Sequence, residues 1–492
     1  MPTITLVRAV QRIRAHARIR GARLGGKWRA ASALALLALS PALSGCILGS
    51  ERPELNLDMS DTYRTAPRGN ADAAVPVLDW WRGFRSSELT TLMEAAQIYN
   101  LDIAVAIAQI VQADAQVGVS GAPLLPSVSG NASAEALRTA GKDTQLYNVN
   151  LSASYMLDFW GKNRATLYAA EENATVARYN REVVTLTTIV TVANTYFQVL
   201  AAQDELRVTR QNLGAAERIL GLIRNQFNGG TASQLDLSQQ ESLVATERAA
   251  IPPLEVTLGQ SIDALALLVA RAPANFAVRG GSTRQIVVPR VTPGLPSELL
   301  YQRPDIRQAE AQLASSNFSV EAARAAFFPQ ISLTGTTGFQ SAALASLFTP
   351  GAWFYTAAAS LTQPIFDGFL LESQLKQAKG VQLQNLQVYR KAVLSAFADV
   401  EKALLALQQF TLQERLQNDV VTASRKAFDV AETQLRGGTI NLITVLQTQQ
   451  TLFTAENNLV LVRLNKLLAA SSLFQALGGG WTPSGTLVSL QQ

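Results

Sequence analysis

The chain has 492 residues, of which 48% are hydrophobic and 16% charged, and this length could hold two or three ordinary globular domains. Its formal charge of +5 comes from residues 1–45, which contain eight basic side chains and no acidic one; the remainder has 34 Lys and Arg against 37 Asp and Glu, a formal charge of −3. This distribution removes the main reason to expect a nucleic-acid partner. His16 and Cys46 are the only histidine and cysteine, which excludes an intrachain disulfide and a Cys/His zinc site, as well as a histidine general base after residue 16.

Residues 1–45 have the composition of a secretory signal peptide. A basic stretch precedes the apolar run 30–39, which is shorter than the ~20 residues that a membrane-spanning helix needs. The sequence Leu43-Ser44-Gly45-Cys46 then resembles a bacterial lipobox, whose cysteine is acylated and becomes the new N-terminus after cleavage. We therefore expect removal of residues 1–45, a covalent lipid on Cys46 and a lipidated N-terminal segment over 46–85. The alternative is a buried cysteine at the end of an apolar helix.

Ile47 follows this cysteine, whereas the usual signal for retention in the inner membrane resembles an aspartate at that position. The sequence therefore predicts sorting to the outer membrane, with the acyl chains adding affinity for lipid.

The rest of the chain contains an internal repeat. Residues 100–129 align with residues 303–332 at a constant shift of 203 positions, and the Gly-Gly-Thr sequences at 229–231 and 437–439 agree at a shift of 208. We predict two tandem copies of one unit, over about 86–290 and 291–480, followed by a C-terminal tail over 481–492. The identical pairs of the first alignment include Asp102/Asp305, Ile103/Ile306, Ala106/Ala309, Gln109/Gln312, Val117/Val320, Ala122/Ala325, Pro126/Pro329 and Ser129/Ser332.

Each copy contains two segments in which apolar and small polar residues alternate, a pattern typical of strands. In the first copy these are about 126–138 and 147–157, and in the second 331–339 and 353–361. Their lengths are near the 9–11 residues of a tilted transmembrane strand, and aromatic residues near their ends suit membrane interfaces. The alternative is a soluble four-stranded sheet packed on helices. The aromatic residues are Tyr147, Tyr155, Phe159, Trp160, Trp353 and Phe366.

Long proline-free runs cover residues 127–251, which include the first two strands, and 365–482, which follow the last two. They contain apolar residues at coiled-coil spacings, and a continuous helix over 164–227 would rise ~95 Å, more than a globular core can cover. The Gly-Gly pairs supply turns, so each copy is predicted to contain a long helical hairpin. The periodic residues are Leu213, Ala216, Leu220, Ile223 and Phe227, then Val393, Phe397, Val400, Leu404 and Leu407, then Val421, Ser424, Phe428, Ala431 and Leu435.

Four strands cannot close a barrel with an open lumen, and open sheet edges in hydrocarbon cost several kcal/mol for each unpaired backbone group. If the strands span a membrane, copies of the chain must share one barrel. The smallest convincing solution is three chains with twelve strands, continued by a ring of helices.

Together these residues resemble the TolC-like outer-membrane factors, in particular the lipoprotein branch (NodT-type) that serves resistance–nodulation–division pumps. The resemblance covers Cys46 to about residue 480. Its motifs are Leu300-Tyr301-Gln302-Arg303-Pro304-Asp305-Ile306-Arg307-Gln308-Ala309-Glu310, Phe328-Pro329-Gln330-Ile331-Ser332-Leu333, Trp80-Trp81 with Leu89, Leu92 and Asn100, and Asp158-Phe159-Trp160-Gly161-Lys162.

The resemblance implies an α+β membrane protein: a homotrimer with a twelve-stranded transmembrane β-barrel, four strands per chain, continuous with a long periplasmic α-helical barrel. It implies an outer-membrane location, a periplasmic adaptor and an inner-membrane efflux pump as partners, and passive exit of small molecules without enzymatic chemistry. The adaptor would contact the hairpin tips, at Gly229, Gly230, Thr231, Asp236, Gly437, Gly438, Thr439 and Asn441.

Two further predictions concern the Arg303 motif and the second hairpin tip. Pro304 can begin a helix and Asp305 suits the positive end of its dipole, so this motif is interpreted as a helix start and not as a ligand site. Family members often place acidic residues near the periplasmic aperture, but the second tip has none. We therefore expect an apolar constriction formed by Ile440 or Leu442, able to close by dewetting.

The alternative functions are the exit duct of a type I protein-secretion system, a structural coiled-coil lipoprotein without a pore, and a lipoprotein hydrolase. The second would not need alternating strands in both repeats, and no Gly-x-Ser-x-Gly sequence supports the third. No cofactor or metal is expected beyond the lipid on Cys46.

Overall fold

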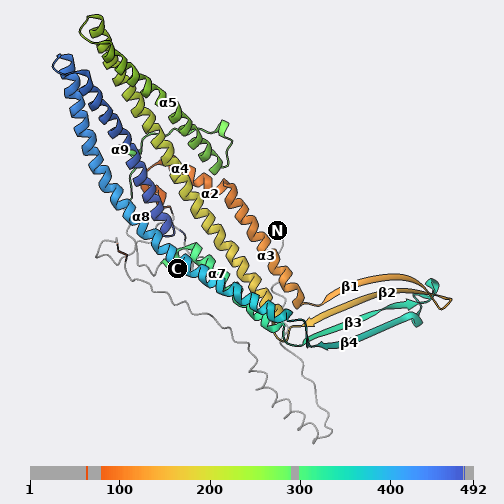
Figure 1. Cartoon of the computed structure of the whole chain (residues 1–492). Helices are drawn as coiled ribbons and strands as arrows, with labels where there is room; N and C mark the ends of the chain where they lie inside the picture. Colours follow the sequence, from red (N-terminus) through yellow and green to blue (C-terminus); the bar gives the residue numbers. More distant parts are fainter. Residues whose placement is uncertain (1–62, 65–78, 290–298, 480, 482–492) are drawn as a thin grey trace, which may run out of the picture. The chain divides into compact units, whose positions relative to one another are not determined.

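The structure, a computed structural model, describes residues 63–64, 79–289, 299–479 and 481 (Figure 1). The expected signal peptide, Cys46 and most of the 46–85 and 481–492 segments lie outside these residues.

The first described elements are the short helix η1 (Trp80–Phe84) and helix α2 (Ser87–Tyr99), followed by helix α3 (Leu101–Gly121). Trp80, Trp81 and Phe84 are buried in a core that also contains residues of the long helices α4 (Lys162–Asn228) and α9 (Leu442–Ala476). The indole of Trp80 stacks on the ring of Phe474, with centroids 4.6 Å apart. The tryptophan pair thus packs the start of the second described segment against α9, the last helix of the second repeat.

Four antiparallel strands form one sheet in the order β1-β2-β3-β4, with bounds Ser127–Thr139, Lys142–Leu157, Gln330–Ser341 and Trp353–Thr362. All four strand predictions are confirmed. The register aligns Tyr155 with Leu333 and Leu333 with Ala359, whereas Ser152 lies opposite Thr336. Because neighbours in register share a face, the sheet has one apolar face and one polar face.

Each pair of strands leads into a very long helix. Helices α4 (Lys162–Asn228) and α8 (Leu370–Arg436) have 67 residues each, a length of about 100 Å. The carboxylate of Asp158 accepts hydrogen bonds from the backbone N–H groups of Asn163 and Arg164, both at 2.9 Å. Asp367 does the same for Leu370 and Leu371 at the start of α8, so both strand-to-helix junctions use an aspartate to satisfy the first turn.

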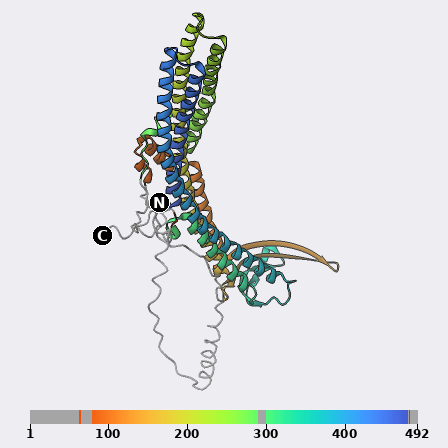
Figure 2. The ribbon, with the colours of Figure 1, turned by 60° about the vertical axis from the view of Figure 1, so that its left-hand side comes forward.

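Helices α5 (Gln234–Leu268) and α9 (Leu442–Ala476) have 35 residues each and return along α4 and α8. The two predicted hairpins are therefore confirmed, and Figures 1 and 2 show them side by side. Helix α7 (Pro304–Ala325) packs against both long helices, and α3 packs against α4. The short elements are η2 (Ala122–Leu124), η3 (Pro273–Asn275), η4 (Thr283–Gln285), α6 (Leu299–Gln302), η6 (Leu344–Ser346) and η7 (Pro350–Ala352).

Some of the predicted coiled-coil residues, such as Ile223 and Phe428, pack between the hairpins, whereas Val393 packs against Ile306 of α7. Ile219 and Ile223 of α4 pack with Phe428 of α8 and with Val445 and Phe453 of α9. Three helical segments, 87–124, 162–228 and 442–476, are long and apolar enough to cross a membrane by length and composition alone. In the second and third segments, 56% of the 18-residue apolar stretch is buried inside the protein. Packing of helix on helix therefore accounts for much of this apolar surface.

Helix α5 continues through Pro252 and Pro253, although the sequence interpretation took prolines as the limits of the long helical runs. Both prolines lie on exposed turns of the helix. Water can solvate the carbonyl groups that lose their helical partners there, so the helix survives the two missing N–H donors.

Candidate functional site

The first hairpin tip is a tight glycine turn. The backbone N–H of Gly229 donates to the carbonyl of Asn225 at 3.1 Å, and Gly230 has a φ of +73°, a conformation that glycine adopts without a steric penalty. Thr231 closes the turn because its N–H and its hydroxyl both donate to the carbonyl of Gln226, at 2.8 and 3.0 Å. These bonds satisfy carbonyl groups at the end of α4 that have no helical partner.

The second tip repeats this geometry in detail. Gly438 has a φ of +69°, and the N–H of Gly437 donates to the carbonyl of Thr433 at 3.1 Å. The N–H and hydroxyl of Thr439 donate to the carbonyl of Gln434, at 2.9 and 3.0 Å. The two tips are thus the same rigid turn, presented twice by each chain.

The helices that leave the tips are capped by the residues expected to contact a partner. The carboxylate of Asp236 accepts hydrogen bonds from the N–H and hydroxyl of Ser233, at 2.9 and 2.7 Å, while the Ser233 hydroxyl accepts from the Asp236 N–H. Asn441 accepts from the N–H and hydroxyl of Thr444, at 3.1 and 2.9 Å. Asp236 and Asn441 therefore stabilise the first turns of helices α5 and α9.

An exposed apolar residue lies two positions after each N-cap residue, Ser233 and Asn441. Leu235 is 64% exposed and Ile443 is 49% exposed, and the two occupy equivalent positions of the repeat. Sequence reasoning overlooked both residues. The signal was available, since each is the second residue after a capping residue at a Gly-Gly tip. Exposed aliphatic side chains at matching places on two rigid turns form a surface suited to another protein.

The two aperture candidates differ in environment. Leu442 is only 3% exposed and packs in the core between the hairpins, with Leu435 and Val445. Ile440 is half-buried and packs against the edge of the same core. The side chain of Leu442 thus supports the tip from inside, whereas that of Ile440 reaches the surface.

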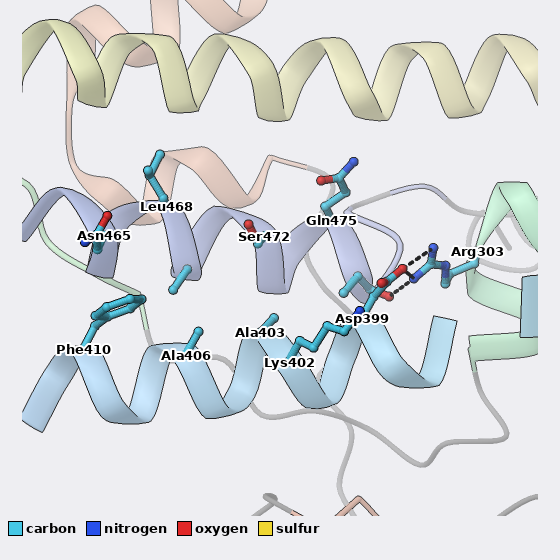
Figure 3. Close-up of a pocket in the computed structure, with 12 residues that line it drawn as sticks. Arg303, Asp399, Lys402, Ala403, Ala406, Phe410, Asn465, Leu468, Ser472 and Gln475 are labelled. Atoms are coloured by element: carbon cyan, nitrogen blue, oxygen red, sulfur yellow. Dashed lines mark hydrogen bonds and ion pairs between the residues drawn. The ribbon is translucent and has the colours of Figure 1, made fainter. Parts of the chain in front are cut away.

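The family motif around residue 303 forms an ion-pair junction between three helices (Figure 3). Arg303 caps α7 and Pro304 is its first residue, which confirms the predicted helix start. The guanidinium of Arg303 donates to both carboxylate oxygens of Asp305, at 3.0 and 2.7 Å, and to the carbonyl of Ala476 at 3.2 Å. It also lies 3.4 Å from a carboxylate oxygen of Asp399 on α8.

This junction closes one end of a cavity of about 530 Å³ between α8 and α9. Phe410 and Leu468 line the other end (Figure 3). Although burial lowers it, the pKa of Arg303 is raised overall by Asp305 and Asp399, so the guanidinium stays charged. Within the described residues no three His, Cys, Asp and Glu side chains are grouped closely enough to hold a metal ion.

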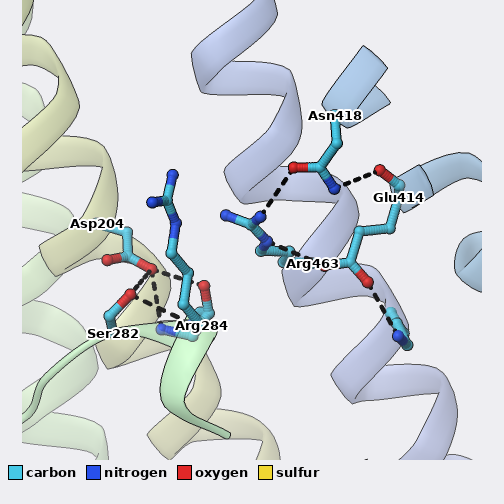
Figure 4. Close-up of polar contacts among 8 residues, drawn as sticks. Asp204, Ser282, Arg284, Glu414, Asn418 and Arg463 are labelled. Atoms are coloured by element: carbon cyan, nitrogen blue, oxygen red, sulfur yellow. Dashed lines mark hydrogen bonds and ion pairs between the residues drawn. The ribbon is translucent and has the colours of Figure 1, made fainter. Parts of the chain in front are cut away.

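Two further polar clusters lie near the middle of the long helices (Figure 4). Asp204 of α4 is buried and accepts hydrogen bonds from the hydroxyl of Ser282 at 3.1 Å and from the N–H and hydroxyl of Thr283 at 2.9 and 2.6 Å. Glu414 of α8 accepts from Arg463 and Lys466 of α9, at 3.0 and 2.9 Å. The first cluster fixes the segment after α5 to α4, and the second joins the helices of the second hairpin.

A family model described as "Outer membrane efflux protein" matches residues 92–271 and 295–479. The chain is 34% identical over 458 residues to the pyoverdine export outer membrane protein OpmQ of Pseudomonas aeruginosa, covering 89% of this chain and 96% of that protein. It is 30% identical over 408 residues to the probable outer membrane lipoprotein SilC of Salmonella typhimurium, covering 82% of this chain and 88% of that protein.

Among solved structures, the open state of the MtrE outer membrane channel of Neisseria gonorrhoeae is 28% identical, with a TM-score of 0.77, covering 88% of this chain and 97% of that chain. The shared fold is that of the trimeric TolC-like channels, in which three chains close one barrel and thereby pair the free edges of β1 and β4. The chain therefore belongs to the outer membrane efflux protein family and is an outer-membrane channel of efflux transport.

Proposed function

We propose that this channel is the exit duct of a tripartite pump, in which an inner-membrane transporter delivers small molecules through a periplasmic adaptor docked on the hairpin tips. No chemistry on the cargo is required, because the transporter supplies the energy and the channel supplies only a path. Relatives named for pyoverdine, toluene and antibiotic export support small molecules as cargo over the proteins of a type I secretion system.

The tip geometry carries the docking proposal. Both tips of each chain present the same glycine turn, with Leu235 exposed on one and Ile443 on the other. Three chains would offer six such turns in a ring. A partner with apolar tips of its own could bind each of them in the same way, burying the two exposed aliphatic side chains.

A lipid on Cys46 would add a second attachment to the membrane. Tyr63 is 17 residues further along the chain, which spans at most about 60 Å when fully extended. Its ring packs with Val400 and Ala403 of α8. Val400 is 30 residues from the start of α8, about 45 Å along that helix. The intervening chain is therefore long enough to join the membrane end of α8 to the place where Tyr63 is held.

At the aperture, we retain Ile440 as the residue that lines an apolar constriction, with Leu442 behind it in the core. An Ile440→Ser substitution is expected to raise single-channel conductance in planar bilayers, because a polar ring no longer favours a dry gap. The control is Leu461→Ser, which changes an exposed aliphatic residue about 30 Å further along α9. Equal conductance of Ile440→Ser and the unmodified channel contradicts the constriction.

Docking is tested in cells that depend on the pump, by measuring susceptibility to its substrates together with the amount of adaptor that copurifies with the channel. Leu235→Asp is expected to raise susceptibility and to reduce the adaptor recovered, because it places a charge at an apolar contact. The matched control is Leu267→Asp, since Leu267 is 69% exposed at the opposite end of the same helix.

The channel itself must be intact for this comparison, so trimer and surface amounts are measured for both variants. Full pump activity and normal adaptor recovery with Leu235→Asp would refute docking at the first tip.

A further inference from the structure

The two faces of the strand sheet differ in chemistry as well as in polarity. The apolar face must meet lipid in a membrane barrel, so the other face lines the lumen. By the strand register, the lumenal face carries mostly hydroxyl and amide side chains. Its members include Ser129, Asn131, Ser133, Glu135, Asn148, Asn150, Ser152, Ser154, Ser332, Thr334, Thr336, Gln340, Thr356, Ser360 and Thr362.

Apart from Lys142 beside the turn, Glu135 is the one charged residue of this face; its partner Leu146 lies one position beyond the end of the β2–β3 pairing at Tyr147. Strands β3 and β4 contain no charged residue at all. The other three charges of the sheet lie at the turn between β1 and β2. Arg138 pairs with Asp143 on the opposite face, with a separation of 3.6 Å, and Lys142 lies on the lumenal face directly beside the turn. Glu135 is four positions before Thr139, the last residue of β1, which pairs with Lys142. Lys142 therefore lies about 13 Å from Glu135 along the strand.

The surroundings of Glu135 offer it no counter-ion. On β2 the residue opposite is Leu146, and its lumenal neighbours along the strand are Thr144 and Asn148. Within the described part of the chain the Glu135 carboxylate makes no ion pair, and its side chain is exposed. In the trimer the free edge of β1 meets β4 of the next copy. That strand and the segment 342–352 before it contain no charged residue, so the neighbouring copy cannot neutralise the carboxylate from there.

We propose that the three Glu135 carboxylates form a charged ring near the outer end of the barrel that makes this part of the lumen favour cations over anions. The inference rests on the trimeric channel. A ring of fixed negative charge attracts cations and repels anions in a water-filled passage. The effect depends on the screening length, which is about 10 Å at 0.1 M salt, shorter than the distance to Lys142, and only about 3 Å at 1 M. Discrimination is therefore expected near 0.1 M salt, where Lys142 is screened from Glu135, and vanishes at molar salt.

The test is the reversal potential of the reconstituted trimer in a tenfold KCl gradient centred near 0.1 M. Glu135→Gln is expected to shift this potential toward anion preference, and Glu135→Lys to shift it further in the same direction. In a gradient at molar concentrations all three proteins give the same value. Asp143→Asn is the matched control, because it removes one carboxylate from the opposite face of the same hairpin and is expected to leave the potential unchanged.

A second measurement changes the charge after folding. Glu135→Cys is treated with a cationic or an anionic thiosulfonate; Cys46 is the only other cysteine of the chain. The anionic reagent is expected to restore cation preference and the cationic reagent to reverse it. Channels that conduct normally, with the same reversal potential near 0.1 M KCl for Glu, Gln and Lys at position 135, overturn the ring and leave the channel intact. Absence of conductance from the unmodified trimer overturns the channel and the ring together.

Discussion

Arg303 donates two parallel hydrogen bonds to the carboxylate of Asp305, from Nε at 3.0 Å and from Nη2 at 2.7 Å. The same guanidinium donates to the carbonyl of Ala476 and pairs with Asp399, on two other helices. The Arg303 side chain is only 11% exposed. A planar guanidinium can serve all these acceptors at once, and a lysine ammonium cannot reproduce this fork.

We therefore expect Arg303→Lys to lower the stability of the trimer by about 2 kcal/mol, since hydrogen bonds to charged groups contribute on that order. The measurement is the thermal midpoint of the purified trimer in detergent. The control is Arg307→Lys, because Arg307 is more exposed and pairs with Glu310 on its own helix, with Tyr179 of α4 as its other polar partner. A midpoint for Arg303→Lys as high as that of Arg307→Lys would show that the junction is dispensable.

Glu414 gives the second hairpin a dependence on pH. Burial raises the pKa of Glu414, but the hydrogen bonds and charges of Lys466 and Arg463 outweigh it and hold this pKa below its ordinary value of 4.5. The stabilisation is therefore complete above pH 4.5 and is lost as the pH falls through the lower pKa of the folded state.

We expect Glu414→Gln to lower the thermal midpoint at pH 7, through a loss of about 1 kcal/mol for this partly exposed cluster. The difference from the unmodified protein shrinks steadily below pH 4.5. Glu94→Gln is the control, because its pair with Arg82 is about half exposed and is expected to contribute little at any pH. A difference for Glu414→Gln that stays constant down to pH 3 contradicts the assignment.

The second tip allows a comparison of adjacent glycines. Gly438→Ala is expected to destabilise the tip by about 1–2 kcal/mol, because alanine is strained at a φ of +69°. Gly437→Ala is expected to be tolerated, since φ there is −81° and an added Cβ would lie 3.6 Å from its nearest neighbour. Amide hydrogen exchange over residues 430–445 measures the effect locally. Equal exchange rates in the two variants would rule out a requirement for the left-handed turn.

Strand β3 contains a second pair of glycines for comparison, Gly335 and Gly338, inside the membrane. A Cβ at Gly338 would lie 2.2 Å from the carbonyl oxygen of Val149 and 2.7 Å from the Cα of Asn150, so Gly338→Ala must push β2 and β3 apart. At Gly335 the nearest atom would be 3.9 Å away. We expect Gly338→Ala to reduce the amount of heat-resistant trimer recovered from outer membranes severalfold, and Gly335→Ala to leave it unchanged. Similar recovery of both variants would show that the register differs in the assembled barrel.

The sequence by itself determined those features that depend on local pattern. Alternation predicted the four strands, coiled-coil spacing between Gly-Gly pairs predicted both hairpins, and the shift of 208 positions predicted that their tips would match. These features follow from backbone periodicity and from the conformational freedom of glycine. Both depend only on residues that are close together in the sequence.

Only the tertiary structure decided which side chains face outward and which distant residues meet. Leu442 is buried while its neighbour Ile443 is half exposed, because the hairpin core covers just one side of α9. Arg303 finds its acceptors on helices 96 and 173 positions away along the chain. Strand register likewise places Arg138 on the face opposite Glu135 and sets Lys142 four residue pairs away from it. Such relationships arise where packed elements meet, and no periodicity along one segment encodes them.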